Sequence, residues 1–465
     1  MNNVTITVNA QTLSAPEGSI LLQVLLDNGV SVPHFCYHEA LGVDGNCRMC
    51  MVEIEGQKRP QIACNTRVKE GMSIRTLSDS IMAVKRSILE LELINHPVDC
   101  PICDQAGECS LQNYYMEVGL YESRIDRADK VRKAKKVDLG SHVILDQERC
   151  VLCARCTRFT ENIIGTGDLV IANRGNHACV TTFEPQGLKA DGYAMNVVDL
   201  CPVGALTSGD FRFHQRVWFL KSDPSLCHGC ARGCSIFIDH YPQKYGDDLI
   251  YRYRPRVERE VNGFFICDEG RLSYKNHTGD ATLTTPRYSG TAITLSEALE
   301  LYHQKLAASG SGVVALASPS LSCENLTALR DYCLQYAIPL FGVERGSFDE
   351  TFGDDFLRLN DRAANRSALP LLGISEDESE MNAALCAASL VLNFDNQTPV
   401  SVDQIHFCVH PIDTRELQIP IAPYTEQSGS IINAFGKVQK FASTIRRRHP
   451  VPPLHELLST IKGLA

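Results

Sequence analysis

Several features are missing from this sequence, and each absence narrows the possible functions. No stretch reaches the roughly 18 apolar residues that span a bilayer, so no direct membrane span is expected. Residues 1–8 alternate polar and apolar without a basic start, so no secretory signal is expected. A net charge of −10 and a pI near 5.8 argue against a nucleic-acid partner.

Two further absences concern cofactors. The sequence has no internal repeat and no G-x-G-x-x-G motif after a strand, so it predicts no NAD or flavin site of its own. Its 20 cysteines in 465 residues fall below the ~8 to 10% typical of a disulfide scaffold. In a reducing compartment, clustered C-x-x-C pairs are more often metal ligands than disulfides.

The cysteines that are present are strongly grouped. Fifteen of them, together with one histidine, form four sets of four. The first set is Cys36, Cys47, Cys50 and Cys64, and the second set is His96, Cys100, Cys103 and Cys109. The third set is Cys150, Cys153, Cys156 and Cys201, and the fourth set is Cys227, Cys230, Cys234 and Cys267. Four sets of this size predict four iron-sulfur clusters.

The first set follows a recognisable order of elements. Alternation at residues 4–8 and 11–15 predicts a strand hairpin, and the apolar run of residues 20–28 before Gly29 predicts a helix. A hairpin, a helix and a cysteine loop are typical of a β-grasp ferredoxin. Four thiolates also suit tetrahedral zinc, which is the alternative here.

The motifs of the first three sets resemble one family. They are Pro33-x2-Cys36-Tyr37 with Gly45-x-Cys47-Arg48-x-Cys50, then Cys100-Pro101-Ile102-Cys103, then Cys150-Val151-Leu152-Cys153-Ala154-Arg155-Cys156. They are similar to the large iron-sulfur subunit of NADH:quinone oxidoreductase, respiratory complex I. The resemblance implies a [2Fe-2S] cluster on the first set and [4Fe-4S] clusters on the others.

The second set needs a ligand that is not a cysteine. Only three cysteines lie between Cys64 and Cys150, and an amphipathic helix over residues 80–93 leads to His96. An isolated histidine is by default a hydrogen-bonded residue, but the count favours His96 as the fourth ligand. A neutral imidazole would leave the cluster less negative and raise its potential.

The third set has two candidates for its last ligand. Cys201 is followed by Pro202, which resembles the remote Cys-Pro of the family, whereas Cys179 has no such proline. We therefore predict Cys201, and removal of Cys179 should leave the clusters intact. Whether Cys179 has any function stays open.

The fourth set is similar to the [4Fe-4S] domain that opens molybdenum and tungsten bis-pterin oxidoreductases. In active enzymes of that kind, the resemblance implies a lysine two residues after the last cysteine, and here Glu269 stands there. Residues 277–465 are too few for a complete pterin pocket. No molybdopterin is expected.

The fold class predicted is a multidomain α+β and α/β protein. The expected domains are a β-grasp [2Fe-2S] ferredoxin domain (1–78), a helical [4Fe-4S] domain with one histidine and three cysteine ligands (79–140), a ferredoxin-like [4Fe-4S] domain (141–219), a molybdoenzyme-type [4Fe-4S] domain (220–276) and a shortened molybdopterin-oxidoreductase-like α/β domain without cofactor (277–465). The charged residues 124–136 predict a solvated linker or docking face.

The resemblance implies an electron relay that has no substrate site of its own. Electrons would arrive from an FMN subunit that oxidises NADH, enter at the first set, and pass through the third set to the second. Other peripheral-arm iron-sulfur subunits and the membrane arm would be partners, on the cytoplasmic side of a bacterial inner membrane. Backbone N–H groups near Gly45, Gly107 and Gly229, and the cations Arg155 and Arg158, are expected to tune the clusters.

Three alternatives remain at this stage. An NAD-linked formate dehydrogenase shares the four-set front end, but Glu269 and the short C-terminal region count against it. An iron-only hydrogenase needs further cysteines, and Cys323, Cys333, Cys386 and Cys408 have no mutual ligand spacing. The third alternative is a zinc-stapled scaffold protein with no redox role.

Overall fold

The computed structural model describes residues 2–120, 124–278, 281–447 and 449–464. The chain divides into two compact units, Met1–Trp218 and Phe219–Ala465, and each is described by itself. Across the described ranges, every helix is too short or too polar to cross a bilayer.

The first unit begins with a five-stranded sheet of strand order β2-β1-β5-β3-β4. Its elements are β1 (Asn3–Val8), β2 (Gln11–Pro16), α1 (Leu21–Asp27), β3 (Met51–Ile54), β4 (Gln61–Ile62) and β5 (Ser73–Arg75). β1 pairs antiparallel with β2 and parallel with β5. The even-numbered residues of β1 are buried and the odd ones mostly exposed, so the period of two sets the register. The predicted hairpin and helix are confirmed.

The helix predicted over residues 80–93 is present as α2 (Asp79–Leu93). Ser78 caps it by accepting a hydrogen bond from the amide of Ile81. Its buried stripe is Ile81, Lys85, Leu89 and Leu93. Lys85 lies in this stripe although it is charged, because its ammonium group donates a 2.9 Å hydrogen bond to the carbonyl of Thr76 and is buried there.

The remainder of the first unit consists of short elements joined by loops. They are α3 (Ser110–Glu117), β6 (Val137–Asp138), β7 (Val143–Leu145), α4 (Arg155–Arg158), β8 (Val170–Ala172), β9 (Cys179–Thr181), α5 (Asn196–Leu200) and β10 (Leu206–Ser208). β10, β7 and β6 form one small sheet, and β8 pairs with β9. Loops therefore dominate this part, where two of the cysteine sets lie.

The second unit contains two larger sheets. One is antiparallel and comprises β11 (Lys221–Leu226), β12 (Ser235–Tyr241) and β13 (Leu249–Pro255), followed by α6 (Asp268–Leu272). The other has seven strands in the order β15-β14-β20-β19-β18-β16-β17. These strands are β14 (Arg287–Tyr288), β15 (Thr291–Ala292), β16 (Val313–Ala317), β17 (Leu340–Phe341), β18 (Leu390–Phe394), β19 (Gln404–Cys408) and β20 (Leu417–Pro420).

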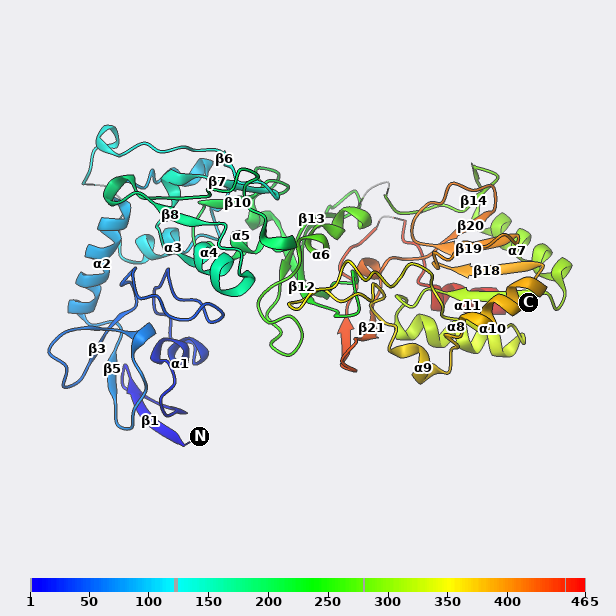
Figure 1. The fold of residues 1–465 in the computed structure, drawn as a ribbon, viewed down its shortest axis with the longest axis horizontal. Helices are drawn as coiled ribbons and strands as arrows, with labels where there is room; N and C mark the ends of the chain where they lie inside the picture. Colours follow the sequence, from blue (N-terminus) through cyan, green and yellow to red (C-terminus); the bar gives the residue numbers. More distant parts are fainter. Residues whose placement is uncertain (1, 121–123, 279–280, 448, 465) are drawn as a thin grey trace. The chain divides into compact units, whose positions relative to one another are not determined.

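Strands β16 to β20 of the large sheet run parallel, and helices cover both of its faces (Figure 1). One face packs against α7 (Leu295–Ser309), α8 (Cys323–Gln335) and α11 (Leu454–Leu464). The opposite face packs against α10 (Glu378–Ala387). All five residues of β16 and of β18 are buried, as a parallel sheet covered on both faces requires. The α/β prediction for this region is confirmed.

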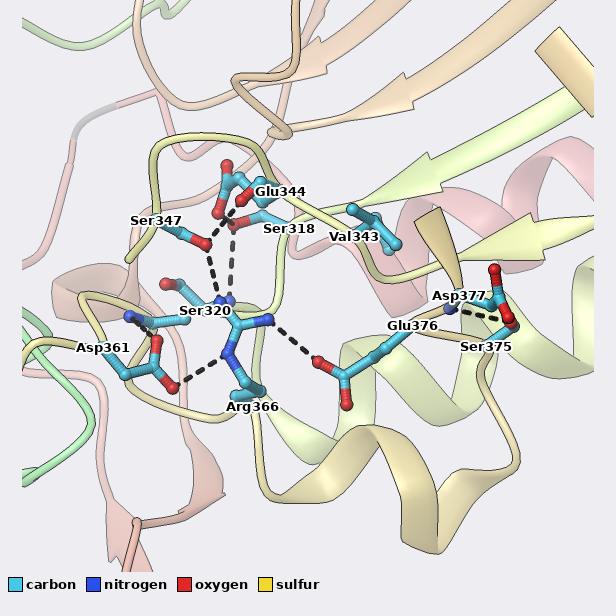
Figure 2. A network of polar contacts seen from close by, with 12 residues as sticks. Ser318, Ser320, Val343, Glu344, Ser347, Asp361, Arg366, Ser375, Glu376 and Asp377 are labelled. Atoms are coloured by element: carbon cyan, nitrogen blue, oxygen red, sulfur yellow. Dashed lines mark hydrogen bonds and ion pairs between the residues drawn. The ribbon is translucent and has the colours of Figure 1, made fainter. Parts of the chain in front are cut away.

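The unit is completed by α9 (Ala368–Leu372) and a ribbon of β21 (Gly429–Ile432) and β22 (Val438–Phe441). At the carboxyl ends of β16 and β17, Figure 2 shows a polar network centred on Arg366. Its guanidinium group donates to Asp361 at 2.8 Å, Glu376 at 2.9 Å and the hydroxyl of Ser347 at 2.6 Å. These bonds fasten two loops to one another at the edge of the sheet.

Glu344 belongs to the same network and is largely enclosed (Figure 2). It accepts hydrogen bonds from the hydroxyl of Ser318 at 3.2 Å and the amide of Gln397 at 2.8 Å. Burial raises the pKa of the Glu344 carboxyl from 4.5 to about 7. The folded protein thus holds the Glu344 proton to a higher pH than the unfolded chain does.

Glu344→Gln should remove this pH dependence. In the parent, the folded state binds more protons between pH 4.5 and about 7, so stability falls as pH rises through that range. Between pH 5 and pH 8 the variant should gain roughly 5 to 10 °C in melting temperature relative to the parent, because the shift from 4.5 to about 7 changes stability by about 2 to 3 kcal/mol over that range. Melting curves followed by circular dichroism would measure it.

The exposed Glu350 supplies the matched control. Glu350→Gln should follow the parent at every pH. A difference between Glu344→Gln and the parent that stays constant from pH 5 to pH 8 would contradict the raised pKa.

Candidate functional site

The four cysteines of the first set converge at the end of the five-stranded sheet. Each is less than a tenth exposed. Cys36 lies in the loop after α1, Cys50 directly precedes β3, and Cys64 lies in the turn after β4. The thiol of Cys47 hydrogen-bonds Cys36 and lowers its pKa to about 5, and Cys64 lowers the pKa of Cys50 in the same way. The set is thus two thiol pairs that also interact electrostatically with one another.

The three cysteines of the second set lie around the start of α3. Cys103 and Cys109 are buried, and the sulfur of Cys100 lies 3.3 Å from the hydroxyl of Tyr115. Burial raises the pKa of the Cys109 thiol to about 11, and the charge of Cys103 adds to this effect. The cysteines of this set are therefore near neighbours.

His96 lies in a different environment from the three cysteines of the second set. It lines a cavity together with Glu92 of α2 and Cys150 of the third set. Its Nδ1 accepts a 3.1 Å hydrogen bond from the amide of Val98, and burial lowers the pKa of the imidazole to about 4. A neutral ring whose Nδ1 is already bonded has Nε2 left as its metal-binding nitrogen. His96 as the ligand that completes the second set stays a prediction.

Lys130 holds the segment around His96 in place, a role that no sequence pattern indicates. Its ammonium group donates to the carbonyls of Leu93 and His96, at 2.8 and 2.7 Å. Residues 124–136 were expected to form a solvated stretch, and most of the described side chains there are exposed. Lys130 is the exception, because two carbonyls satisfy its buried charge.

The four cysteines of the third set line one small cavity with Leu145, Val203 and Ala205. The amides of Val203, Ala205 and Leu206 point at the sulfur of Cys201, and the amide of Leu152 lies 3.4 Å from the sulfur of Cys150. Leu152 and Ala154 adopt left-handed backbone conformations, with φ of 49° and 60°. These turns aim N–H groups inward at the sulfurs.

Cys179, the rival to Cys201, lies in β9 beside Val180. Val180 is buried and lines the third-set cavity. Because consecutive side chains of a strand point to opposite faces, Cys179 points away from that cavity. The geometry therefore favours Cys201 over Cys179.

The four cysteines of the fourth set line a cavity of about 440 Å³ in the second unit. The amide of Gly229 lies 3.4 Å from the sulfur of Cys227, and the amide of Gly270 lies 3.3 Å from the sulfur of Cys267. A Cβ at Gly270 would stand 3.0 and 3.2 Å from the sulfurs of Cys227 and Cys267. A side chain at this position would therefore crowd both sulfurs, and glycine leaves them room.

Glu269 lines the same cavity and forms an ion pair with Arg362. Arg362 also donates a 2.9 Å hydrogen bond to the carbonyl of Gly229, which follows Cys227 in the loop. Glu269, which stands where active bis-pterin enzymes are expected to have a lysine, is thus connected through Arg362 to the loop that carries Cys227.

Two glycines near the sulfurs were not anticipated from the sequence. Gly270 is one, and Gly204 is the other, because a Cβ at Gly204 would lie 2.4 Å from the sulfur of Cys103. Gly204 follows Cys201 by three residues, so the loop of the third set touches the second set. A glycine within three residues of a predicted ligand was the available signal.

Backbone N–H groups reach sulfurs near all three of the expected glycines. The amide of Gly45 points at Cys36, and that of Gly229 at Cys227. Near Gly107 the donor is the amide of Gln105, which points at the sulfur of Cys103, whereas the amide of Gly107 itself donates to the side chain of Gln112 at 3.0 Å. A Cβ at Gly107 would clash with Val217 at 2.9 Å, so this glycine serves close packing.

The donor chemistry of the sets fits iron-sulfur clusters. The sulfurs are mostly buried and receive backbone N–H groups, which stabilise anionic sulfur. Among the residues that the structure describes, no three His, Cys, Asp or Glu side chains are placed to hold a single metal ion. The assignment of individual ligands remains a prediction.

Three sequence models of known families match the first unit. The 2Fe-2S iron-sulfur cluster binding domain matches residues 1–79. The NADH-ubiquinone oxidoreductase-G iron-sulfur binding region matches residues 85–124, and the ferredoxin-like domain of NADH-quinone oxidoreductase subunit 3 matches residues 140–207. These matches support both [2Fe-2S] and [4Fe-4S] binding.

Whole-chain comparison finds relatives named as the G subunit of NADH-quinone oxidoreductase. The protein of Streptomyces coelicolor is 37% identical over 332 residues, covering 70% of this chain and 39% of the relative. That of Mycobacterium bovis is 39% identical over 285 residues, covering 61% and 34%. That of Rickettsia felis is 37% identical over 271 residues, covering 58% and 39%.

Among solved structures, a chain of an NAD+-reducing [NiFe]-hydrogenase in the H2-reduced state is similar. It is 27% identical with a TM-score of 0.40, covering 46% of this chain and 91% of that one. The chain spans less than two fifths of the length of the three relatives from Streptomyces, Mycobacterium and Rickettsia. Through its iron-sulfur region, the chain is a homologue of the G subunit of NADH-quinone oxidoreductase.

Proposed function

We propose that this chain is an electron-relay subunit of an NADH:quinone oxidoreductase. The first set would hold one [2Fe-2S] cluster, and the second, third and fourth sets would each hold one [4Fe-4S] cluster. Such clusters supply one-electron transfer without bond making at the metal. The chain itself would bind neither NADH nor quinone.

The observation that carries this proposal is that the third set touches both the first and the second within one unit. The guanidinium group of Arg155 donates to the carbonyls of Tyr37 and Leu200, which neighbour Cys36 and Cys201. The amide of Ser110, next to Cys109, donates a 2.9 Å hydrogen bond to the carbonyl of Pro202, next to Cys201. An order of first, third and second set follows, which suits a relay.

The residues of the chain would perform three tasks in this relay. Apolar side chains such as Phe35 and Leu145 exclude water from the sulfurs. Backbone N–H groups at Gly229, Gly270 and Leu152 stabilise negative charge on sulfur. Hydrogen bonds between the loops of neighbouring sets fix their spacing, on which electron transfer depends.

The relationship also suggests partners and a place in the cell. The proposed partners are an FMN subunit that oxidises NADH, other peripheral-arm iron-sulfur subunits, and a membrane arm, on the cytoplasmic side of a bacterial inner membrane. Within the chain, residues 1–78, 79–140, 141–219 and 220–276 would be four cluster domains. Residues 277–465 would be an α/β domain without cofactor that serves packing.

Reduction by NADH tests the proposal directly. The visible absorption of the anaerobically purified chain should not bleach with NADH alone, because its sequence predicts no nicotinamide site. It should bleach when the chain is co-purified with its flavin-containing NADH-oxidising partner. Bleaching by NADH without that partner, or none in its presence, would contradict the relay.

The ligand choice in the third set gives a paired prediction. Cys201→Ser should lower the iron content by about four atoms per chain, the size of one [4Fe-4S] cluster. Cys179→Ser, its matched control, should leave iron unchanged, because its side chain points away from the third-set cavity. Iron and acid-labile sulfide assays of both variants measure this, and the reverse pattern would assign Cys179 as the ligand.

A further inference from the structure

Two arginine side chains of α4 reach from the third set to the loop of the first set. Arg155 donates to the carbonyl of Tyr37 at 2.5 Å and to the carbonyl of Leu200 at 3.2 Å. Arg158 donates to the carbonyl of Cys36 and, at 3.2 Å, to that of Leu41. Since α4 also carries Cys156, the helix is connected to both the first set and the third set.

The two arginines differ in what they join. The distant bonds of Arg155 go to a neighbour of Cys36 in the first set and to a neighbour of Cys201 in the third set. Those of Arg158 go to the first-set loop, and its remaining bond, to Ala154, stays within its own helix region. Arg155 therefore bridges two sets, whereas Arg158 clamps one.

The charge of Arg155 also lies between the two sets. The sulfurs of Cys153, Cys201 and Cys36 all interact electrostatically with its guanidinium group. Its Nε is buried without a hydrogen-bond partner among the described residues. A guanidinium group keeps its charge in proteins, so one cation acts on sulfurs of both sets in a part of the protein shielded from water.

We infer that Arg155 is a positioning residue that fixes the first and third sets against each other and raises their electron affinities together. The inference rests on the proposed relay function. Each one-electron reduction adds one negative charge to a cluster. No proton is transferred, and no bond forms or breaks. A fixed cation near both sites stabilises both reduced forms, and it offsets their mutual repulsion.

Redox titration of the full chain, followed by electron paramagnetic resonance, tests this inference. Arg155→Gln should lower the reduction equilibrium constants of the first and third clusters about tenfold each, which corresponds to about 59 mV for a one-electron couple. Arg155→Lys keeps the charge and should shift each constant less than about threefold. The second and fourth clusters should keep their potentials.

Two matched controls separate charge from general structural damage. Arg158→Gln should shift the first cluster alone, because its distant bonds go to the first-set loop. Arg67→Gln removes an exposed arginine of the same unit that also donates to a carbonyl, that of Gly18 at 3.2 Å, and should shift neither.

Several outcomes would overturn the inference. Unshifted potentials in Arg155→Gln, or a shift confined to one cluster, would end the bridging role. If Arg155→Gln loses a cluster altogether, a tenfold shift of both constants in Arg155→Lys would end the role of charge. The absence of iron-sulfur signals from the parent chain would instead contradict the proposed function, so the two failures are distinguishable.

Discussion

Sulfur held out of water is the constraint on which this structure depends. Burial raises the pKa of the Cys153 thiol to about 12 and of the Cys109 and Cys267 thiols to about 11, so a bare thiolate at these places would be unstable. A buried thiolate therefore needs positive charge beside it. Iron supplies most of that charge when a cluster is bound, and backbone N–H groups and Arg155 supply the rest.

The same constraint explains why loops rather than helices or sheets surround the sulfurs. Within helices and sheets, most backbone N–H groups are already hydrogen-bonded to backbone carbonyls. In tight turns, N–H groups remain free to point at sulfur. The positive φ angles of Leu152 and Ala154 create such turns. The amide of Gly270 is free for a different reason, because it lies in the first turn of α6, where N–H groups have no partner within the helix. The sheets and helices then serve mainly to hold the turns in register.

Sequence patterns predicted the elements that periodicity or spacing determines. The β1 and β2 hairpin, α1 and α2 all follow from the pattern of apolar residues, and the cysteine spacings predicted which sulfurs would meet. Contacts between segments that are distant in the sequence could not be predicted from these patterns. Neither the burial of Lys85 nor the anchoring of the His96 segment by Lys130 follows from local pattern, because both depend on carbonyls elsewhere in the fold. The close approach of Gly204 to Cys103 has the same origin.

Metal and sulfide analysis of the anaerobically isolated chain tests the central claim most directly. One [2Fe-2S] and three [4Fe-4S] clusters predict about fourteen iron atoms and about as many acid-labile sulfides per chain, with a visible band that dithionite bleaches. Zinc at about four per chain, with no labile sulfide and no colour, would contradict the account and leave a zinc-stapled scaffold in its place.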